Sequence, residues 1–289
     1  MEPERWTIRK LLQWCGPWLA KQGVESPRLD GELLLAHALK LRRLDLFLDP
    51  ERPLSGEELT GFKALIRRRA MREPTAYLLG RKGFWTLELE VGPGVLIPRP
   101  ETERLVETAL RRAPEKEAAY RVVEIGVGSG AVLFSLLQER PQATGLGVDL
   151  SPEALAWAGR NAARLGLAER TTLLEGDLFA PLGEEALPAF DAVVSNPPYV
   201  ARGEWAELAP EIARWEPALA LEGGEDGLDC YRRLIPQAWR WLKPGGALSL
   251  EIGAGQGDAV MGRMTAAGFR DVTLDRDYAG LPRVVSGAR

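Results

Sequence analysis

Residues 190–200 read Phe-Asp-Ala-Val-Val-Ser-Asn-Pro-Pro-Tyr-Val, an apolar run that ends in an amide, two prolines and an aromatic ring. Because proline donates no ladder hydrogen bond, a buried strand must stop at Asn196. The Asn196 side-chain oxygen and the Pro197 carbonyl can accept both N–H groups of a planar nitrogen and aim its lone pair at an electrophile. Pro198 stiffens this geometry, and Tyr199 can pack against the flat group. We predict Asn196, Pro197 and Tyr199 as catalytic residues and Asn196 to Tyr199 as the substrate site.

Asn-Pro-Pro-Tyr resembles the Asn/Asp/Ser-Pro-Pro-Tyr/Phe/Trp signature of enzymes that methylate planar nitrogens, either exocyclic amines of bases or side-chain amides. The lone pair of such a nitrogen is delocalised, so the nitrogen attacks poorly unless it is held in place. Orientation alone can supply about 7–11 kcal/mol of the barrier in favourable cases. A strong base is not needed beforehand, because the nitrogen becomes acidic only as the new bond forms. The single histidine, His37, lies far from this stretch in the sequence, in agreement with that expectation.

A second candidate site lies in residues 122–131, Val-Val-Glu-Ile-Gly-Val-Gly-Ser-Gly-Ala. A strand followed by a glycine-rich turn and a helix lets backbone approach a ligand closely, and the helix start offers unpaired N–H groups. Gly126, Gly128 and Ala131 fit the dinucleotide pattern G-x-G-x-x-G/A, which leaves a nicotinamide enzyme open. The spacing E-x-G-x-G-x-G, which begins at Glu124, instead resembles motif I of S-adenosylmethionine enzymes.

The ends of two further strands supply candidate cofactor contacts. Asp149 can accept hydrogen bonds from ribose hydroxyls, and charge-assisted bonds of that kind contribute roughly 1.5–3 kcal/mol. Asp177 and Leu178 suit an adenine ring, with the acid on its amine and apolar groups on its face. Either aspartate could instead only cap the segment that follows it. The predicted cofactor site comprises Gly126, Val127, Gly128, Ser129, Gly130, Asp149, Asp177, Leu178 and Asn196.

The elements that position these residues alternate from Tyr120 onward. We expect strands near 121–125, 144–149, 171–175, 190–195, 246–252, 270–275 and 282–287, and helices near 131–140, 152–165, 228–242 and 256–267. This alternation predicts an α/β fold with a parallel sheet covered on both faces. The last two strands have no helix between them. An antiparallel C-terminal hairpin on such a sheet is typical of Rossmann-like class I methyltransferases.

Residues 1–80 predict a small helical bundle from leucines at helical spacing. Ser55-Gly56-Glu57-Glu58 is a capping box that opens one helix, which should end near Arg72 because Pro74 disfavours helix before it. His37 is expected to be a partly buried structural residue of this bundle.

Residues 81–104 predict a linking β-hairpin. Apolar and acidic residues alternate over 87–91, Gly92-Pro93-Gly94 forms the expected turn, and 95–97 is the expected return strand. Residues 105–289 then form the predicted methyltransferase domain.

Composition narrows the class of protein. The 289 residues carry a net charge of −4, with 45% hydrophobic and 27% charged residues, as in soluble globular proteins. Arg67-Arg68-Arg69 is the one dense basic run, so we expect no direct nucleic-acid partner. No apolar run approaches the ~20 residues that span a bilayer, and the first residues lack a secretory signal. Cys15 and Cys230 lie far apart, which favours a reduced, cytoplasmic setting and no metal.

With these motifs the chain resembles the release-factor glutamine methyltransferase family, also called PrmC or HemK. The resemblance covers nearly the whole length. Two runs carry most of it, Ile-Pro-Arg-Pro-Glu-Thr-Glu at 97–103 and Gly-Gly-Glu-Asp-Gly-Leu-Asp at 223–229. It implies transfer of a methyl group from S-adenosylmethionine to the glutamine amide of the Gly-Gly-Gln motif in bacterial-type peptide chain release factors. The products would be N5-methylglutamine in a translation-termination protein and S-adenosylhomocysteine.

The resemblance also implies roles for particular residues. Residues 126–130 and Asp149 would bind the cofactor, Asn196 would lie close to the methyl donor, and the N-terminal bundle would recognise the protein substrate. Arg67 and Arg69, expected to be exposed, would either contact that substrate or support the bundle. Position 178 is leucine where some relatives place a larger aromatic residue beside the adenine, so the adenine contact there differs.

Three other functions stay open on the motifs alone. A DNA or RNA adenine-N6 methyltransferase shares the Asn-Pro-Pro-Tyr chemistry, but the net charge, the missing basic target-recognition region and the full-length resemblance disfavour it. A non-catalytic cofactor-binding module would have no use for Asn196. A nicotinamide enzyme would bind NAD, whereas the favoured reading predicts binding of S-adenosylmethionine.

Overall fold

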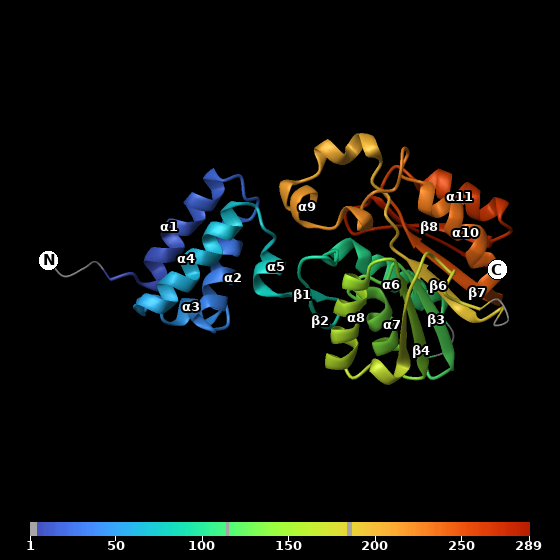
Figure 1. The fold of residues 1–289 in the computed structure, drawn as a ribbon, viewed down its shortest axis with the longest axis horizontal. Helices are drawn as coiled ribbons and strands as arrows, with labels where there is room; N and C mark the ends of the chain where they lie inside the picture. The colour runs from blue at the N-terminus through green and yellow to red at the C-terminus, as the bar shows by residue number, and fades with distance from the viewer. Residues whose placement is uncertain (1–4, 114–115, 184–186) are drawn as a thin grey trace. The chain divides into compact units, whose positions relative to one another are not determined.

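The computed structural model describes residues 5–113, 116–183 and 187–289, and the chain divides into two compact units. The first comprises Met1–Arg81 with Ala209–Trp215, and the second comprises Lys82–Leu208 with Glu216–Arg289. The helices of the first unit are α1 (Ile8–Lys21), α2 (Pro27–Leu39), α3 (Asp45–Leu48), α4 (Gly56–Ala70), α5 (Thr75–Leu79) and α9 (Pro210–Trp215) (Figure 1). A short segment from late in the chain therefore belongs to the helical unit.

The first unit is a bundle around an apolar core, as the leucine spacing predicts. The side chains of Ile8, Leu34, Leu35 and Phe62 are fully buried in it. The capping box of α4 is confirmed: the Ser55 hydroxyl accepts from the Glu58 N–H at 3.2 Å, and the Glu58 carboxylate accepts from the Ser55 N–H at 2.8 Å. The expectation of a partly buried His37 was wrong, because α2 turns this side chain to solvent.

The expectation that Arg69 is exposed was also wrong. Its side chain is only 6% exposed, with Nε 2.7 Å from the Asp30 carboxylate and Nη2 2.8 Å from the Glu211 carboxylate of α9. Arg72 also donates to Glu211, from Nε at 2.6 Å. Arg67 stays exposed on the same helix. Residues two apart on a helix face different directions, so a basic run divides between solvent and core.

The linking hairpin lies earlier than the sequence suggested. Its strands are β1 (Arg81–Phe84) and β2 (Leu87–Glu90), and the turn between them contains Trp85 at a φ of 54°. Residues 95–97 form no strand. Gly94 has a φ of 90°, which bends the backbone away from an extended path after β2. A tryptophan at positive φ is not a recognisable turn residue, so the sequence pointed to the glycines instead.

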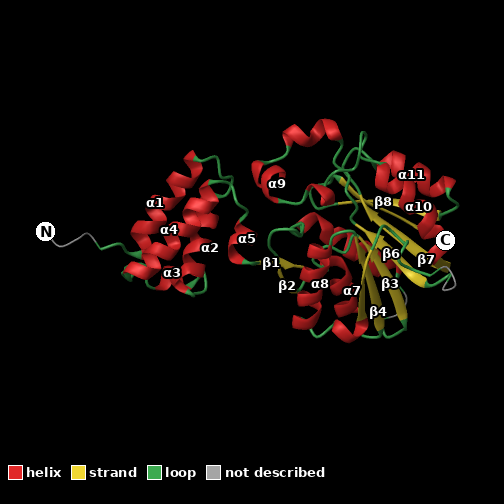
Figure 2. Ribbon diagram, viewed as in Figure 1, coloured by secondary structure: helices red, strands yellow, loops and turns green. Residues whose placement is uncertain are grey.

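The second unit is built on a seven-stranded sheet of order β5-β4-β3-β6-β7-β9-β8 (Figure 2). Its strands are β3 (Tyr120–Ile125), β4 (Ala143–Asp149), β5 (Thr171–Glu175), β6 (Phe190–Ser195), β7 (Leu242–Glu251), β8 (Arg270–Arg276) and β9 (Pro282–Ala288). Neighbouring strands are parallel from β5 to β7, and β9 pairs antiparallel with both β7 and β8. The predicted fold class, including the antiparallel C-terminal hairpin, is confirmed.

Helices cover both faces of this sheet (Figure 1). The helical segments of the second unit are η1 (Pro100–Thr102), α6 (Glu103–Arg112), α7 (Ala131–Glu139), α8 (Pro152–Arg164), η2 (Ala168–Arg170), η4 (Arg202–Glu207), η5 (Ala218–Ala220), α10 (Asp229–Trp241) and α11 (Gly257–Ala266). Alternate strand residues separate the two layers: Val122 and Val194 pack with α6, α7 and α8, whereas Val123 and Val193 pack with α10 and α11. Parallel strands buried on both faces bring their carboxyl ends to one edge.

Among the residues that the structure describes, no helix is long and apolar enough to cross a membrane.

Candidate active site

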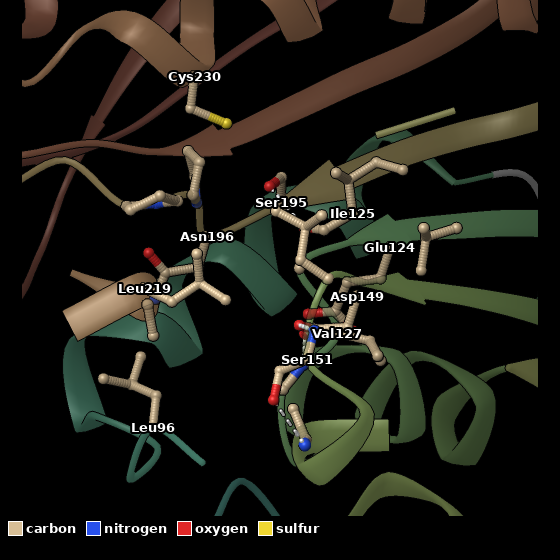
Figure 3. Close-up of a pocket in the computed structure, with 18 of the residues that line it drawn as sticks. Leu96, Glu124, Ile125, Val127, Asp149, Ser151, Ser195, Asn196, Leu219 and Cys230 are labelled. Carbon is tan, nitrogen blue, oxygen red and sulfur yellow. Dashed lines mark hydrogen bonds between the residues drawn. The ribbon is translucent and has the colours of Figure 1, made fainter. Parts of the chain in front are cut away.

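A pocket of about 330 Å³ opens at the carboxyl edge of the sheet, within the second unit. It is lined by most of the residues predicted from the sequence: Gly126, Val127, Gly128, Ser129, Asp149, Asp177, Leu178, Asn196, Pro197 and Pro198. Two predicted residues, Gly130 and Tyr199, are not part of its lining. Figure 3 shows Asp149 and Ser151 on one side of the pocket and Asn196 with Leu219 on the other. The two candidate sites of the sequence thus form one cavity.

The glycine turn bends β3 sharply into α7. The N–H groups of Gly126 and Val127 both donate to the Val148 carbonyl, at 2.8 and 3.0 Å, which fixes the turn against β4. A Cβ on Gly126 would lie 3.9 Å from the Asn196 backbone oxygen, so this turn and the end of β6 approach closely. Gly130 has a φ of 86°, and a Cβ there would lie 2.0 Å from the Phe134 ring. The packing of the Phe134 ring in α7 therefore requires glycine at position 130.

Asp149 both organises the turn and faces the pocket. Its Oδ2 accepts from the Gly128 N–H at 2.8 Å, and its Oδ1 accepts from the Ser151 N–H at 3.0 Å. Burial raises the pKa of this carboxyl, and the two N–H groups counteract the rise. The side chain that caps α8 is Ser151, which accepts from the Ala154 N–H at 3.2 Å. Helix capping therefore does not account for Asp149, and each of its oxygens keeps a lone pair for a ligand.

Glu124 is a buried carboxyl behind the same turn. It is 2% exposed and lines the pocket, and its Oε2 accepts from the Leu133 N–H of α7 at 2.8 Å. Burial raises its pKa well above the usual range. This contact ties the end of β3 to the first turn of α7, which explains why the acid precedes the glycines.

Asp177 and Leu178 follow β5 and close another side of the pocket. The Asp177 carboxylate forms an ion pair with Arg233 of α10, and both residues line the cavity. Leu178 is buried at a φ of 53°, in the left-handed region that leucine rarely adopts. The structure thus places an acid and an apolar side chain here, as the sequence predicts, and adds a guanidinium from α10.

Asn196 stands directly after β6. The preceding Ser195 donates from its hydroxyl to the Ile125 carbonyl at 2.6 Å, which ties the ends of β6 and β3 together. The Asn196 Nδ2 donates to the hydroxyl of Thr102 at 3.3 Å. Thr102 lies in η1, is 4% exposed and also lines the pocket. Thr102 belongs to the Ile-Pro-Arg-Pro-Glu-Thr-Glu run, but nothing in the sequence signalled this contact.

Tyr199 lies behind the cavity, half-buried against the core under α10 and α11. Burial, together with the nearby Glu251, raises the pKa of its phenol to about 12. Its carbonyl accepts from the Gln256 Nε2 at 3.0 Å. In this structure the ring does not reach the pocket, so a stacking role for Tyr199 stays a prediction.

The Gly-Gly-Glu-Asp-Gly-Leu-Asp run supports the Asn-Pro-Pro-Tyr backbone. A Cβ on Gly223 would lie 2.8 Å from the Tyr199 Cα, and one on Gly227 would lie 2.3 Å from the Tyr199 oxygen. Val200 donates to Leu221 and accepts from Gly223, both at 2.9 Å. Glycine is therefore required at positions 223 and 227, where this segment crosses the end of the Asn-Pro-Pro-Tyr motif.

A second support was not foreseen from the sequence. The buried carboxylate of Glu216 accepts from the Ile97 N–H at 2.9 Å and forms an ion pair with Arg99, which lines the pocket. This pairing joins residues 97–99 to the segment before Pro217. Arg99 lies in the 97–103 run that carries the family resemblance, but its contact with Glu216 could be found only from the fold. Within the described ranges, no group of three or more His, Cys, Asp or Glu side chains could hold a metal ion.

Comparisons with known proteins agree over the whole chain. A family model described as the PrmC N-terminal domain matches residues 10–80, and one described as a methyltransferase domain matches residues 122–216. A release factor glutamine methyltransferase of Geobacter sulfurreducens is 48% identical over 286 residues, covering 99% of this chain and 98% of that protein. One of Caulobacter vibrioides is 45% identical over 271 residues, covering 94% and 92%.

Among solved structures, the hMettl16 catalytic domain in complex with the MAT2A 3'UTR hairpin 6 has a TM-score of 0.57. It is 16% identical and covers 77% of this chain and 81% of that chain. This likeness concerns the fold alone.

Proposed function

Because the chain belongs to the release factor glutamine methyltransferase family, we propose that it methylates the glutamine side-chain amide in the Gly-Gly-Gln motif of bacterial-type peptide chain release factors. The chain is an S-adenosylmethionine-dependent methyltransferase. When bound, that cofactor supplies an electrophilic methyl group and leaves as S-adenosylhomocysteine. The observation that carries the proposal is Asn196, whose side chain lines the same pocket as the glycine turn.

The residues of the pocket fit this cofactor. Gly126 and Gly128 line the pocket, and a Cβ at either position would make only ordinary van der Waals contact with its nearest neighbour, at 3.9 or 4.0 Å. Asp149 offers free lone pairs to a sugar diol, and Asp177 with the buried Leu178 offers an acceptor and an apolar wall to a base. These acceptors and this apolar wall suit the sugar hydroxyls, the exocyclic amine and the flat face of an adenosine group.

The chain's own residues then orient the nucleophile. The Asn196 Oδ1 and the Pro197 carbonyl each accept one N–H of the glutamine amide, which turns the nitrogen lone pair toward the methyl group. Two prolines in succession restrict the backbone at these acceptors. Orientation of this kind can lower the barrier by about 7–11 kcal/mol in favourable cases. As the N–C bond forms, the nitrogen becomes strongly acidic and releases one of its two protons to solvent water.

We also propose how the protein recognises its substrate and where it acts. The helical unit recognises the release factor, the hairpin links it to the methyltransferase domain, and the protein acts in the cytoplasm without direct nucleic-acid contact. The net charge of −4 supports the last point. The domain limits of 1–80, 81–104 and 105–289 stay predictions of the sequence.

The decisive experiment incubates the protein with a purified release factor and labelled S-adenosylmethionine, then maps the modified residue by mass spectrometry. We expect a gain of one CH2 on the glutamine of the Gly-Gly-Gln motif, and no label on DNA or RNA of mixed sequence. The Asn196→Ala variant should bind the cofactor almost normally while its turnover collapses. Label on adenine, or on another side chain, would refute the proposed substrate.

A further inference from the structure

Asn196 is one end of a short chain of polar side chains that runs into the core. Its Nδ2 donates to the Thr102 hydroxyl at 3.3 Å. The Thr102 hydroxyl lies close enough to the Glu251 carboxylate, at the end of β7, to lower the pKa of that carboxyl as a hydrogen-bond donor. Glu251 is 1% exposed, and its Oε2 has no hydrogen-bond partner among the described residues. Buried carboxyls are rarely left incompletely paired, so this one calls for an explanation.

The sheet register brings the ends of this chain together. Strands β6 and β7 are parallel with Ser195 opposite Leu250, so Asn196 and Glu251 are the next residues at the same edge. The Tyr231 hydroxyl of α10 donates to the Glu251 backbone oxygen at 2.7 Å, which holds the strand end in place. The carboxyl thus stands directly behind the residue that holds the substrate.

The Thr102 hydroxyl has a single proton, so the group to which it donates decides whether it donates to Asn196 or accepts from it. When it donates that proton to an ionised Glu251, its oxygen can only accept from Asn196. The Asn196 NH2 group must then point to Thr102, and its Oδ1 must point into the pocket. The reverse amide orientation would direct an N–H group, instead of an acceptor, at the substrate nitrogen.

We propose that Thr102 and Glu251 are positioning residues that fix the Asn196 amide with its oxygen toward the methyl acceptor. This inference rests on the proposed function for its link to turnover. It assigns a role to two buried residues that do not themselves touch the reacting atoms.

The orientation of the Asn196 amide should depend on pH, because it depends on the ionisation of Glu251. Burial raises the pKa of the Glu251 carboxyl to about 7, and Thr102 and Arg283 of β9 counteract the rise. Arg99 also lowers it, whereas Glu101 of η1 raises it. The phenols of Tyr199 and Tyr231 also interact with Glu251.

The direction of the pH effect follows from the ionised state. Above a pH of about 7, Glu251 is ionised and the amide is held in the productive orientation. Below it, the Glu251 carboxyl can donate to Thr102, which can then donate to the Asn196 Oδ1 and reverse the amide. We therefore expect kcat to fall as the pH is lowered through this range.

The kinetic test uses the full chain with purified release factor. Thr102→Val should lower kcat with unchanged S-adenosylmethionine affinity, by roughly the 10- to 100-fold that is lost when the hydrogen-bond partner of a metal-binding side chain is removed in metalloenzymes. Thr102→Ser should restore most of the turnover. Glu251→Gln should remain folded and lose the pH dependence near 7. The matched control is Thr108→Val, since Thr108 is also buried and bonds a carboxylate, Asp275 at 3.0 Å, but does not line the pocket.

A second measurement does not depend on turnover. Asn161 and Asn196 are the only asparagines in the sequence, so labelling with 15N-asparagine gives two side-chain amide signals. The Asn196 signal, identified by its loss in Asn196→Ala, should shift with pH near 7 in the wild type and not in Glu251→Gln. Full turnover by Thr102→Val, or a pH-independent Asn196 signal in the wild type, would overturn the inference. A wild type that transfers no methyl group to the release factor would instead refute the proposed function.

Discussion

The Nδ2 of Asn161, near the C-terminal end of α8, donates to the backbone carbonyl of Ser129 in the glycine turn at 3.0 Å. The same fully buried side chain accepts from the Glu90 N–H at 2.7 Å and donates to the Glu90 carbonyl at 3.0 Å. One amide therefore joins the second strand of the hairpin to the turn that faces the pocket.

Asn161→Leu should destabilise the protein and loosen this turn. It removes the side-chain partner of one buried backbone group, the Ser129 carbonyl, and of two partly buried groups on Glu90. A fully buried group left without a partner costs about 1–3 kcal/mol. We expect denaturant unfolding to show a loss of at least about 2 kcal/mol, with weaker S-adenosylmethionine binding. Thr265→Ala, at an exposed hydroxyl of α11 that bonds only the Met261 carbonyl, is the control. Equal stability of the two variants would show that the Asn161 contacts contribute nothing.

Asp149→Ala should weaken S-adenosylmethionine binding by roughly 1.5–3 kcal/mol, because it removes the carboxylate for which we propose a charge-assisted hydrogen bond to the ribose. Isothermal titration measures this directly. Asp258→Ala removes an exposed acid from the first turn of α11 and should leave the affinity unchanged. Wild-type affinity in Asp149→Ala would mean that this carboxylate only holds the turn, through its bonds to Gly128 and Ser151.

Arg69→Ala should destabilise the helical unit strongly, whereas Arg67→Ala should not. Removing one partner of a buried ion pair costs about 3–5 kcal/mol, and Arg69 is paired with two carboxylates. An exposed arginine changes stability by only about 0.5 kcal/mol or less. Thermal unfolding separates the two variants, and release-factor binding by Arg67→Ala tests the remaining substrate role. Similar unfolding of both would contradict the ion-pair network.

Glu251→Gln should change how stability depends on pH. The folded pKa is raised from 4.5 to about 7, so the folded state retains a proton that the unfolded state has lost between these values. Stability must therefore fall as the pH rises through this window, by about 3 kcal/mol at 1.36 kcal/mol per unit of pKa. Denaturant unfolding between pH 4.5 and 7 should show this slope in the wild type and a flatter one in the variant. Parallel slopes would mean that Glu251 titrates normally.

The sequence was sufficient to predict the strands of the sheet and most of the residues that line the pocket. Asp149, Asp177 and Asn196 could be placed in one site because parallel strands bring their carboxyl ends to one edge of the sheet. The hairpin was misplaced because Trp85 turns the chain at a positive φ that no tryptophan signals. Thr102 and Glu251 could not be connected, since their contact depends on which strands are neighbours and in what register.

The burial of Arg69 was missed for a related reason. Its partners lie 39 and 142 residues away, and neither separation leaves a local pattern. Periodicity predicts which face of a helix is apolar, but it does not predict a guanidinium that is buried because two distant acids surround it.

The presence of Ala209–Trp215 in the helical unit limits how this protein can be cut apart. A fragment that stops at residue 81 would retain Arg69, Arg72 and Asp30 but lose Glu211, the acid that both arginines share. A fragment that begins at residue 82 would carry that acid without its counterions. A chimera made with a single junction near residue 81 would leave charged side chains without partners in both parts. A working chimera must therefore transfer residues 1–81 and 209–215 together.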